Sequence, residues 1–289
     1  MPVLHAAYVQ TNPSYLAVES NLQAAESQIS SLDADLIVFP ELFTSGYFFQ
    51  SVEHLAQAAE PIPGGPSTRA LKSWATSLDA TIVAGLAERA GERFYNSAVL
   101  VRPDGTIDTY RKVHLFYEEK TLFEPGDLGF PVFDLETSDG TSYRLGIMVC
   151  FDWYFPEAAR TLALKGADVI AHPSNLVLPH CPESMPVRAR ENHVFTITAN
   201  RYGEEHKEGE ALTFIGTSEI CDPSGTIREQ AERTGHEVGL VAIDPQEARD
   251  RRINTHNDVL EDRRPDTYRS RMTGGSAAKN TAQRSATTS

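Results

Sequence analysis

The sequence predicts an α/β fold made of two similar halves, each built around a β-sheet. Short apolar runs typical of buried strands alternate along the chain with segments whose apolar residues recur at helical spacing. Two strand segments, "DADLIVFPE" at 33–41 and "GADVIAHPS" at 166–174, share one pattern, since each follows a helix-like stretch and ends at a proline. This internal repeat indicates two sheets of comparable build that pack against each other.

Local sequence signals assign the elements of the first half in order. Apolar runs that predict buried strands lie at 3–9, 35–43 and 80–88. Helical spacing of apolar residues is found at 12–32, where it follows an Asn-Pro-Ser start, and at 67–78. The segment 96–114 predicts a hairpin, because Asp104-Gly105 between two apolar runs suits a tight turn.

The second half repeats this order. A hairpin is expected over 130–150, with its turn at Asp139-Gly140. Helices are expected at 156–166 and 185–193, and strands at 167–175 and 194–201. The remaining elements are a solvated loop at 203–210, a last hairpin from 216–230 to 238–245 and a helical segment at 246–252.

Composition and charge narrow the possible partners. The chain has 289 residues, of which 40% are hydrophobic, so it can bury the core of one large domain. Its net charge of −14 repels nucleic acid and anionic lipid, and both are excluded as partners. No apolar run approaches the roughly 20 residues of a membrane span. The first residues lack the basic and apolar regions of a signal peptide, and a cytoplasmic location is expected.

The chain is expected to form a single domain over 1–272, followed by a tail at 273–289. Gly, Ser, Ala and Thr dominate the tail, which favours a flexible or partner-packed segment. The three cysteines, Cys150, Cys181 and Cys221, are too few for a disulfide framework. Cys221 lies within a predicted hairpin and Cys181 in a predicted loop, so neither has the position of a nucleophile.

Two residues that could take part in catalysis directly follow predicted strands. Glu41 closes the run "DLIVFP", and a carboxylate there must be paired or neutralised unless it is simply a partly exposed loop residue. Cys150 closes "RLGIMV" and precedes Asp152 and the helix start at Pro156. It is either a small core residue or a nucleophile presented by a strand–turn–helix, where a helix N-terminus would lower the thiol pKa.

Other polar residues carry weaker signals. Lys112, in "YRKVHLF", has the sequence context of an ordinary solvated lysine. His172, His180, Cys181 and His193 lie near one another in sequence, but they lack the paired spacing of a zinc site, and no metal is expected. No histidine is clearly placed as the base of a Cys–His enzyme.

Three motifs in a fixed order resemble the carbon–nitrogen hydrolase family, also called the nitrilase superfamily, and its amidase-like branch in particular. They are "DLIVFPELFTSGY", "YRKVHLFYEEKTLFEPGD" and "GIMVCFDWYFPEAAR". The strings "GADVIAHPSN" and "RARENHVFTITANR" add to a similarity that extends from about Val3 to Pro245. The resemblance implies a four-layer α-β-β-α sandwich, commonly assembled as a homodimer or a larger homo-oligomer.

The resemblance also implies a catalytic triad of Glu41, Lys112 and Cys150. A second active-site glutamate falls on Glu119, next to Glu118. In this chemistry Cys150 attacks an amide or nitrile carbon, Glu41 transfers protons, and Lys112 with the backbone N–H of Phe151 stabilises the oxyanion. Neither a metal nor an organic cofactor is required.

Three functions follow from these residues as alternatives. The first is an amidase that converts a small amide to a carboxylic acid and ammonia. The second is a nitrilase acting on a small aliphatic nitrile, and the third is a non-catalytic binding or scaffold protein. The residues expected to line the substrate pocket follow the candidate catalytic strands; they are Tyr47, Tyr117, Phe151, Trp153, His172 and Asn175.

Overall fold

The computed structural model describes residues 3–272 and divides the chain into two compact units, Met1–Arg251 and Arg252–Ser289. The first unit contains both sheets, and the second contains α7 (Pro265–Met272). The predicted tail at 273–289 lies outside the described residues. Along 3–272, no helix has both the length and the apolar character needed to cross a membrane.

The first sheet has the strand order β14-β1-β2-β3-β4-β5. Its strands are β1 (Leu4–Gln10), β2 (Leu36–Val38), β3 (Thr81–Ala90), β4 (Arg93–Val101), β5 (Ile107–Arg111) and β14 (Glu237–Ile243). β1, β2 and β3 are parallel, whereas β4, β5 and β14 run antiparallel to their neighbours. The parallel strands are almost wholly buried, as expected for a sheet covered on both faces.

The second sheet has the strand order β13-β12-β9-β8-β7-β6. Its strands are β6 (Val132–Glu136), β7 (Ser142–Ile147), β8 (Val169–Pro173), β9 (Phe195–Ala199), β12 (Glu219–Cys221) and β13 (Ile227–Gln230). Here β7, β8 and β9 form the parallel centre, as β1 to β3 do in the first sheet. The repeated segments 33–41 and 166–174 supply β2 and β8, which contact each other across the two sheets.

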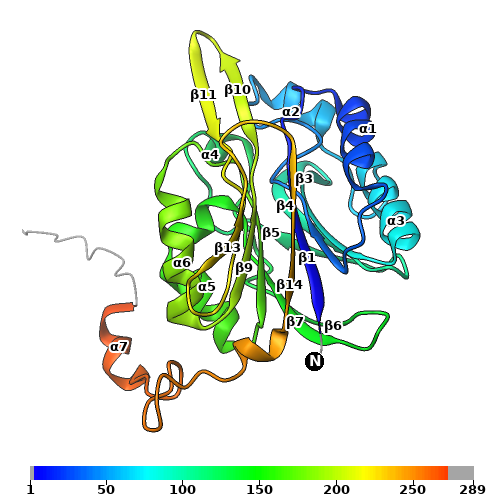
Figure 1. The fold of residues 1–289 in the computed structure, drawn as a ribbon. Coiled ribbons are helices and arrows are strands. Elements are labelled where there is room, and N and C mark those ends of the chain that lie inside the picture. The colour runs from blue at the N-terminus through cyan, green and yellow to red at the C-terminus, as the bar shows by residue number, and fades with distance from the viewer. Residues whose placement is uncertain (1–2, 273–289) are drawn as a thin grey trace, which may run out of the picture. The chain divides into compact units, whose positions relative to one another are not determined.

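Helices cover the outer faces of both sheets (Figure 1). The helices of this unit are α1 (Val18–Ile29), α2 (Val52–Ala58), α3 (Pro66–Leu78), α4 (Glu119–Leu122), α5 (Pro156–Leu164) and α6 (His180–Asn192). α1 and α3 pack on the first sheet, while α5 and α6 pack on the second. The predicted four-layer α-β-β-α sandwich is therefore confirmed.

Local sequence explains where these helices begin and which face they bury. α3 starts at Pro66, whose fixed φ suits the first helical position, and it ends before Asp79 in the left-handed conformation. Its apolar face carries Leu71 and Trp74 into a core shared with Ile37 of β2. α5 likewise begins at a proline, Pro156.

Four sequence predictions about the later elements are wrong. Cys181 lies in α6 and not in a loop. The polar stretch 203–210 is not a loop, since it forms most of a hairpin of β10 (Tyr202–Lys207) and β11 (Glu210–Ile215). The last predicted hairpin divides between the sheets, because β13 pairs with β12 but β14 pairs with β1 of the other sheet. The helical segment 246–252 shrinks to a short 3-10 helix, Pro245–Ala248.

A further buried carboxyl group belongs to Glu219, the first residue of β12. Glu219 is fully buried, and the Gln230 Nε2 atom donates a hydrogen bond to its Oε2 atom at 3.0 Å. Within the described chain, its Oε1 atom has no hydrogen-bond partner. Burial raises the pKa of Glu219 to about 8, and the bond from Gln230 opposes this shift. The carboxyl is therefore mostly protonated in the folded protein at neutral pH.

We expect Glu219 to make the folded state less stable as the pH rises. The raised pKa means that the folded state binds a proton more tightly than the unfolded state, whose ordinary value is 4.5. The free energy of unfolding should thus fall between about pH 5 and pH 8, by on the order of 3 kcal/mol from this group. Urea denaturation of wild-type and Glu219→Gln protein across this range measures the effect.

The Glu219→Gln protein should lose this part of the pH dependence, because an amide does not titrate. Glu136→Gln is the matched control, since Glu136 is exposed on edge strand β6 of the same sheet. It should follow the wild-type curve. Equal pH slopes for wild-type and Glu219→Gln protein would show that Glu219 is ionised in the folded state.

Candidate active site

Glu41 follows β2 and is held close to β3. It is fully buried, and a Cβ atom added at Gly85 of β3 would lie 2.4 Å from the Glu41 Cα atom, so only glycine permits this approach. The Glu41 Oε1 atom accepts hydrogen bonds from Asn96 Nδ2 at 2.7 Å and from Lys112 Nζ at 2.6 Å. The Oε2 atom has no partner in the described part of the chain. One carboxylate oxygen is thus fixed, and the other is available to accept a proton.

Lys112, just after β5, lies between two carboxylates. Its Nζ atom is 2.6 Å from Glu41 Oε1 and 2.7 Å from Glu119 Oε1, and the residue is buried. Its backbone N–H donates to the carbonyl oxygen of Asn96 at 2.8 Å. Burial alone lowers the pKa of Lys112, but the charges of Glu119 and Glu41 outweigh it and raise the pKa above its ordinary value. The ammonium group is therefore positively charged and fixed in position.

Glu119, at the start of α4, completes this buried cluster. Besides Lys112, its Oε1 atom accepts a hydrogen bond from the Tyr47 hydroxyl at 2.6 Å, and its Oε2 atom accepts one from the Phe116 N–H at 3.1 Å. Burial raises the pKa of Glu119 to about 6, although the charge of Lys112 opposes this shift. The neighbouring Glu118 instead pairs with Lys207 at 2.6 Å.

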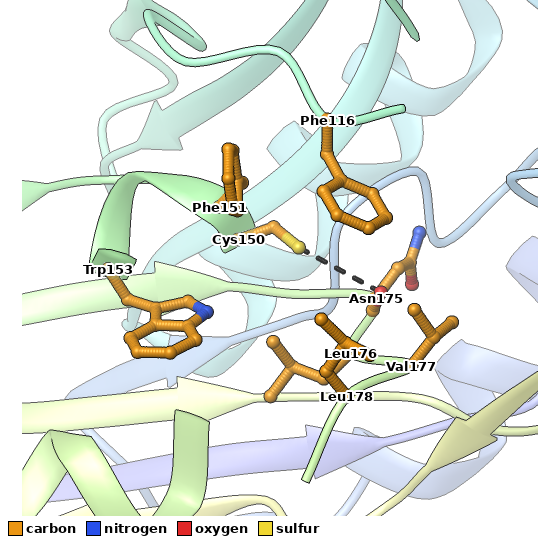
Figure 2. Close-up of a pocket in the computed structure, with 8 residues that line it drawn as sticks. All are labelled: Phe116, Cys150, Phe151, Trp153, Asn175, Leu176, Val177 and Leu178. Atoms are coloured by element: carbon orange, nitrogen blue, oxygen red, sulfur yellow. Dashed lines mark hydrogen bonds between the residues drawn. The ribbon is translucent and has the colours of Figure 1, made fainter. Parts of the chain in front are cut away.

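Cys150 lies on a sharp turn after β7. Its φ angle of +42° is in the left-handed region, which is unfavourable for a residue with a side chain. A short 3-10 helix (Cys150–Tyr154) begins at this residue, and α5 begins only at Pro156. The Sγ atom lies 3.8 Å from the backbone carbonyl oxygen of Asn175, as Figure 2 shows. The turn therefore presents the thiol beside the segment that follows β8.

The buried carboxylate of Asp152 stabilises this turn. Its Oδ2 atom accepts hydrogen bonds from the Val149 N–H at 2.9 Å and the Tyr110 hydroxyl at 2.6 Å. Its Oδ1 atom lies 2.8 Å from His114 Nδ1. These bonds connect β5 and the loop after it to the cysteine turn, so they hold Lys112 and Cys150 in a common frame.

The thiol pKa differs from the sequence-based expectation. Burial raises the pKa of Cys150 well above its ordinary value, and the Glu41 charge raises it further, while Lys112 opposes these effects. The predicted lowering by a helix N-terminus is wrong, because the residue begins a 3-10 turn in a buried site that contains two carboxylates. A neutral thiol needs a base to accept its proton during attack.

Cys150 opens into a cavity of about 320 Å³, open solvent at its mouth included (Figure 2). The residues that line it are Phe116, Cys150, Phe151, Trp153, Asn175, Leu176, Val177 and Leu178. Three of the predicted pocket residues, Phe151, Trp153 and Asn175, are among them. The lining is mainly apolar, which is typical of a site for a small organic molecule.

The other three predicted pocket residues lie elsewhere. Tyr47 is buried against Glu119, and Tyr117 is 52% exposed; both line a separate cavity next to Glu119. His172 is fully buried, and its Nε2 atom donates to the carbonyl oxygen of Cys150 at 2.9 Å. Burial lowers the pKa of His172 to about 4, so the ring is neutral. His172 is not among the residues that line the cavity, and its side chain contacts the backbone of the cysteine turn instead.

Further residues, which the sequence patterns do not reveal, hold this site together. Asn96 bonds both Glu41 and the Lys112 backbone, and the signal that could have revealed it is a polar residue within the apolar strand β4. Glu205 of the β10–β11 hairpin is also buried, and it accepts bonds from the N–H groups of Tyr47 and Phe48. Arg201 pairs with Glu205, so this hairpin anchors the loop that positions Tyr47.

Known proteins are similar to this chain in sequence and in fold. Residues 5–253 match the family model described as carbon-nitrogen hydrolase. A relative named nitrilase, from Pyrococcus abyssi, is 50% identical over 269 residues, which cover 92% of this chain and 99% of the relative. A relative named N-carbamoylputrescine amidase, from Solanum lycopersicum, is 32% identical over 279 residues, which cover 89% and 91%.

The chain is also similar to a solved structure in which a small molecule is bound covalently to a cysteine. It is a mutant of the amidase from Nesterenkonia sp. AN1, in which the acetamide moiety of fluoroacetamide has added covalently at the active-site cysteine. The TM-score is 0.75 at 25% sequence identity, and the match covers 93% of this chain and 97% of the other.

Proposed function

The chain belongs to the carbon–nitrogen hydrolase family, and from this premise we propose that it hydrolyses a small amide to a carboxylic acid and ammonia. It is an enzyme of the amidase- or nitrilase-like type, so the non-catalytic alternative is set aside. The observation that supports the proposal best is the buried cluster in which Lys112 is held 2.6 Å from Glu41 and 2.7 Å from Glu119.

In the proposed first half-reaction, the Cys150 sulfur attacks the amide carbon while Glu41 accepts the thiol proton on its unpartnered oxygen. The Lys112 ammonium and the Phe151 N–H stabilise the negative oxygen of the tetrahedral intermediate. Glu41 returns the proton to the nitrogen, the C–N bond breaks, ammonia leaves and a thioester remains on Cys150. Glu119 holds Lys112 in position throughout.

In the second half-reaction, Glu41 removes a proton from a water molecule, which attacks the thioester carbon. The C–S bond breaks, the carboxylic acid leaves and the proton returns to Cys150. No step requires a metal or an organic cofactor.

Amide hydrolysis is preferred because a planar amide needs both acceptors for its NH₂ group and donors for its oxygen. Glu41 and Glu119 supply acceptors, and Lys112 supplies a donor. The second candidate is a nitrilase, which the relative of that name from Pyrococcus abyssi favours at 50% identity. A linear nitrile offers only one acceptor nitrogen to the same cluster.

We expect the amide of a matched pair to have the higher kcat/KM. The pairs are aliphatic amides and the nitriles with the same carbon skeleton, and ammonia release measures turnover. The expected cause is the loss of hydrogen bonds to the carboxylates when the NH₂ group is absent. Faster turnover of the nitrile in several pairs would reverse the order of the two candidates.

We also propose that the protein is a homodimer or a larger homo-oligomer and works in the cytoplasm. The family resemblance supports the first point, and the three cysteines, all free, suit a reducing compartment. Light scattering at micromolar concentration should give at least twice the 31.8 kDa chain mass. A monomer mass would contradict the proposed assembly.

A further inference from the structure

Asn175 is the polar side chain that the proposed mechanism leaves unused in the pocket. It follows β8 and is 3% exposed, and it lines the cavity together with Cys150 (Figure 2). Its backbone carbonyl oxygen lies 3.8 Å from the Cys150 sulfur. In contrast to this backbone oxygen, neither side-chain atom, Oδ1 or Nδ2, has a hydrogen-bond partner among residues 3–272.

A buried amide without partners is costly, because both polar atoms give up water and gain nothing in return. The other buried asparagines each make at least one side-chain hydrogen bond within residues 3–272. Asn200 bonds through both polar atoms, whereas Asn96 and Asn192 bond only through Nδ2. Asn175, with neither polar atom bonded, lies inside the pocket that contains the candidate nucleophile. The missing partner is therefore expected to be a group of the substrate.

The rest of the pocket indicates the charge of that group. Phe116, Phe151, Trp153 and the segment 176–178 supply aromatic and aliphatic surface, and none of the residues that line the cavity carries a formal charge. The nearby Lys112 is already bonded to Glu41 and Glu119. An ionised carboxylate or ammonium group on the substrate would lose its water without gaining an ion pair. The group that meets Asn175 is therefore neutral.

The geometry of the Asn175 amide limits which neutral group of the substrate can bind to it. Asn175 presents a donor and an acceptor side by side in one plane, so a single group that satisfies both must also offer one of each. A primary carboxamide does so and forms two parallel hydrogen bonds, whereas a carboxylate or a cyano group only accepts. We propose that Asn175 recognises a second, neutral carboxamide, so that the substrate is a small aliphatic diamide; this rests on the amide hydrolysis proposed above.

The test compares substrates of one shape. The diamides malonamide, succinamide and glutaramide are each matched with the amide in which a branched alkyl group replaces one carboxamide, such as 4-methylpentanamide for succinamide. The singly hydrolysed acid, such as succinamate, tests the effect of charge. For the best chain length, we expect the diamide to exceed both analogues in kcat/KM by at least about tenfold.

Asn175→Leu keeps the shape of the side chain and removes both polar atoms. It should lower the ratio of kcat/KM for the diamide to kcat/KM for its alkyl analogue by at least about tenfold. Asn175→Asp should also lower this ratio, because a carboxylate cannot donate. An unchanged ratio in Asn175→Leu, or a wild-type preference for the alkyl analogue or the acid, overturns the inference.

Binding to Cys150→Ala protein, measured by calorimetry, separates recognition from turnover. The diamide should bind more tightly than its alkyl analogue, and Asn175→Leu in the same background should abolish the difference. Turnover of the alkyl analogues without a diamide preference would leave amide hydrolysis standing and overturn the role of Asn175. If no amide is turned over, the proposed function fails, and the binding difference alone decides whether Asn175 recognises a carboxamide.

Discussion

Replacing Cys150 with alanine should lower kcat by at least about four orders of magnitude, because no other group in the pocket can form the thioester. The fold should survive, since the thiol faces a cavity and its removal takes away only one atom. Ammonia release and thermal unfolding measure the two effects. In the wild-type protein, mass spectrometry of the stopped reaction should find the acyl group on Cys150.

Cys221→Ala is the matched control for this prediction. Cys221 is equally buried, but it lies on β12 and is not among the residues that line the pocket. This variant should lose some stability and keep its turnover. Substantial ammonia release by the Cys150→Ala protein would exclude Cys150 as the nucleophile.

The second large effect is expected at Glu41 and Lys112, the two charged residues to which the proposed mechanism gives a chemical role. Glu41→Gln keeps the bond from Asn96 but removes the base, and Lys112→Ala removes the donor to the oxyanion, so each should lower kcat by about three orders of magnitude or more. Because the residues act as one unit, the double variant should be little worse than the poorer single variant. Steady-state ammonia release measures all three.

Lys112→Ala should also change the stability of the protein. Without the lysine, two buried carboxylates would be left unpaired, and protonation of one of them is the expected response. The Lys112→Ala protein should therefore be least stable at high pH. Near wild-type turnover by this variant would remove Lys112 from the mechanism, and additive losses in the double variant would mean that the two residues act separately.

Local patterns predicted most strands and helices of this fold because periodicity reports burial directly, whereas the four-layer arrangement came from the resemblance to a family. The apolar runs that became β2 and β8 were recognisable from their composition and from the prolines that end them. Local periodicity does not reveal which other strand a given strand will pair with. β14 follows β13 in sequence yet joins the other sheet, where it pairs with β1, and the contact that decides this is far away in the chain.

In the site, too, local sequence reveals some residues, whereas others depend on contacts between distant parts of the chain. Glu41 and Cys150 could be singled out because each closes an apolar run, whereas Lys112 became a candidate only through resemblance to a family. Asn96 was missed because its importance lies in bonds to Glu41 and Lys112, which are distant in sequence. The alternation along β8 likewise does not reveal that the His172 side chain meets the backbone of the cysteine turn.

The β10–β11 hairpin has a consequence for engineering. Glu205, in the middle of its first strand, reaches Lys112 through Tyr47 and Glu119 in turn. Lys207 and Glu210, which flank the turn at Glu208-Gly209, bond Glu118 and Tyr117, close to Glu119 in sequence. Laboratory evolution can therefore vary length and charge at the two turn residues, whereas libraries at Glu205, Lys207 or Glu210 will select for compensating changes around the lysine.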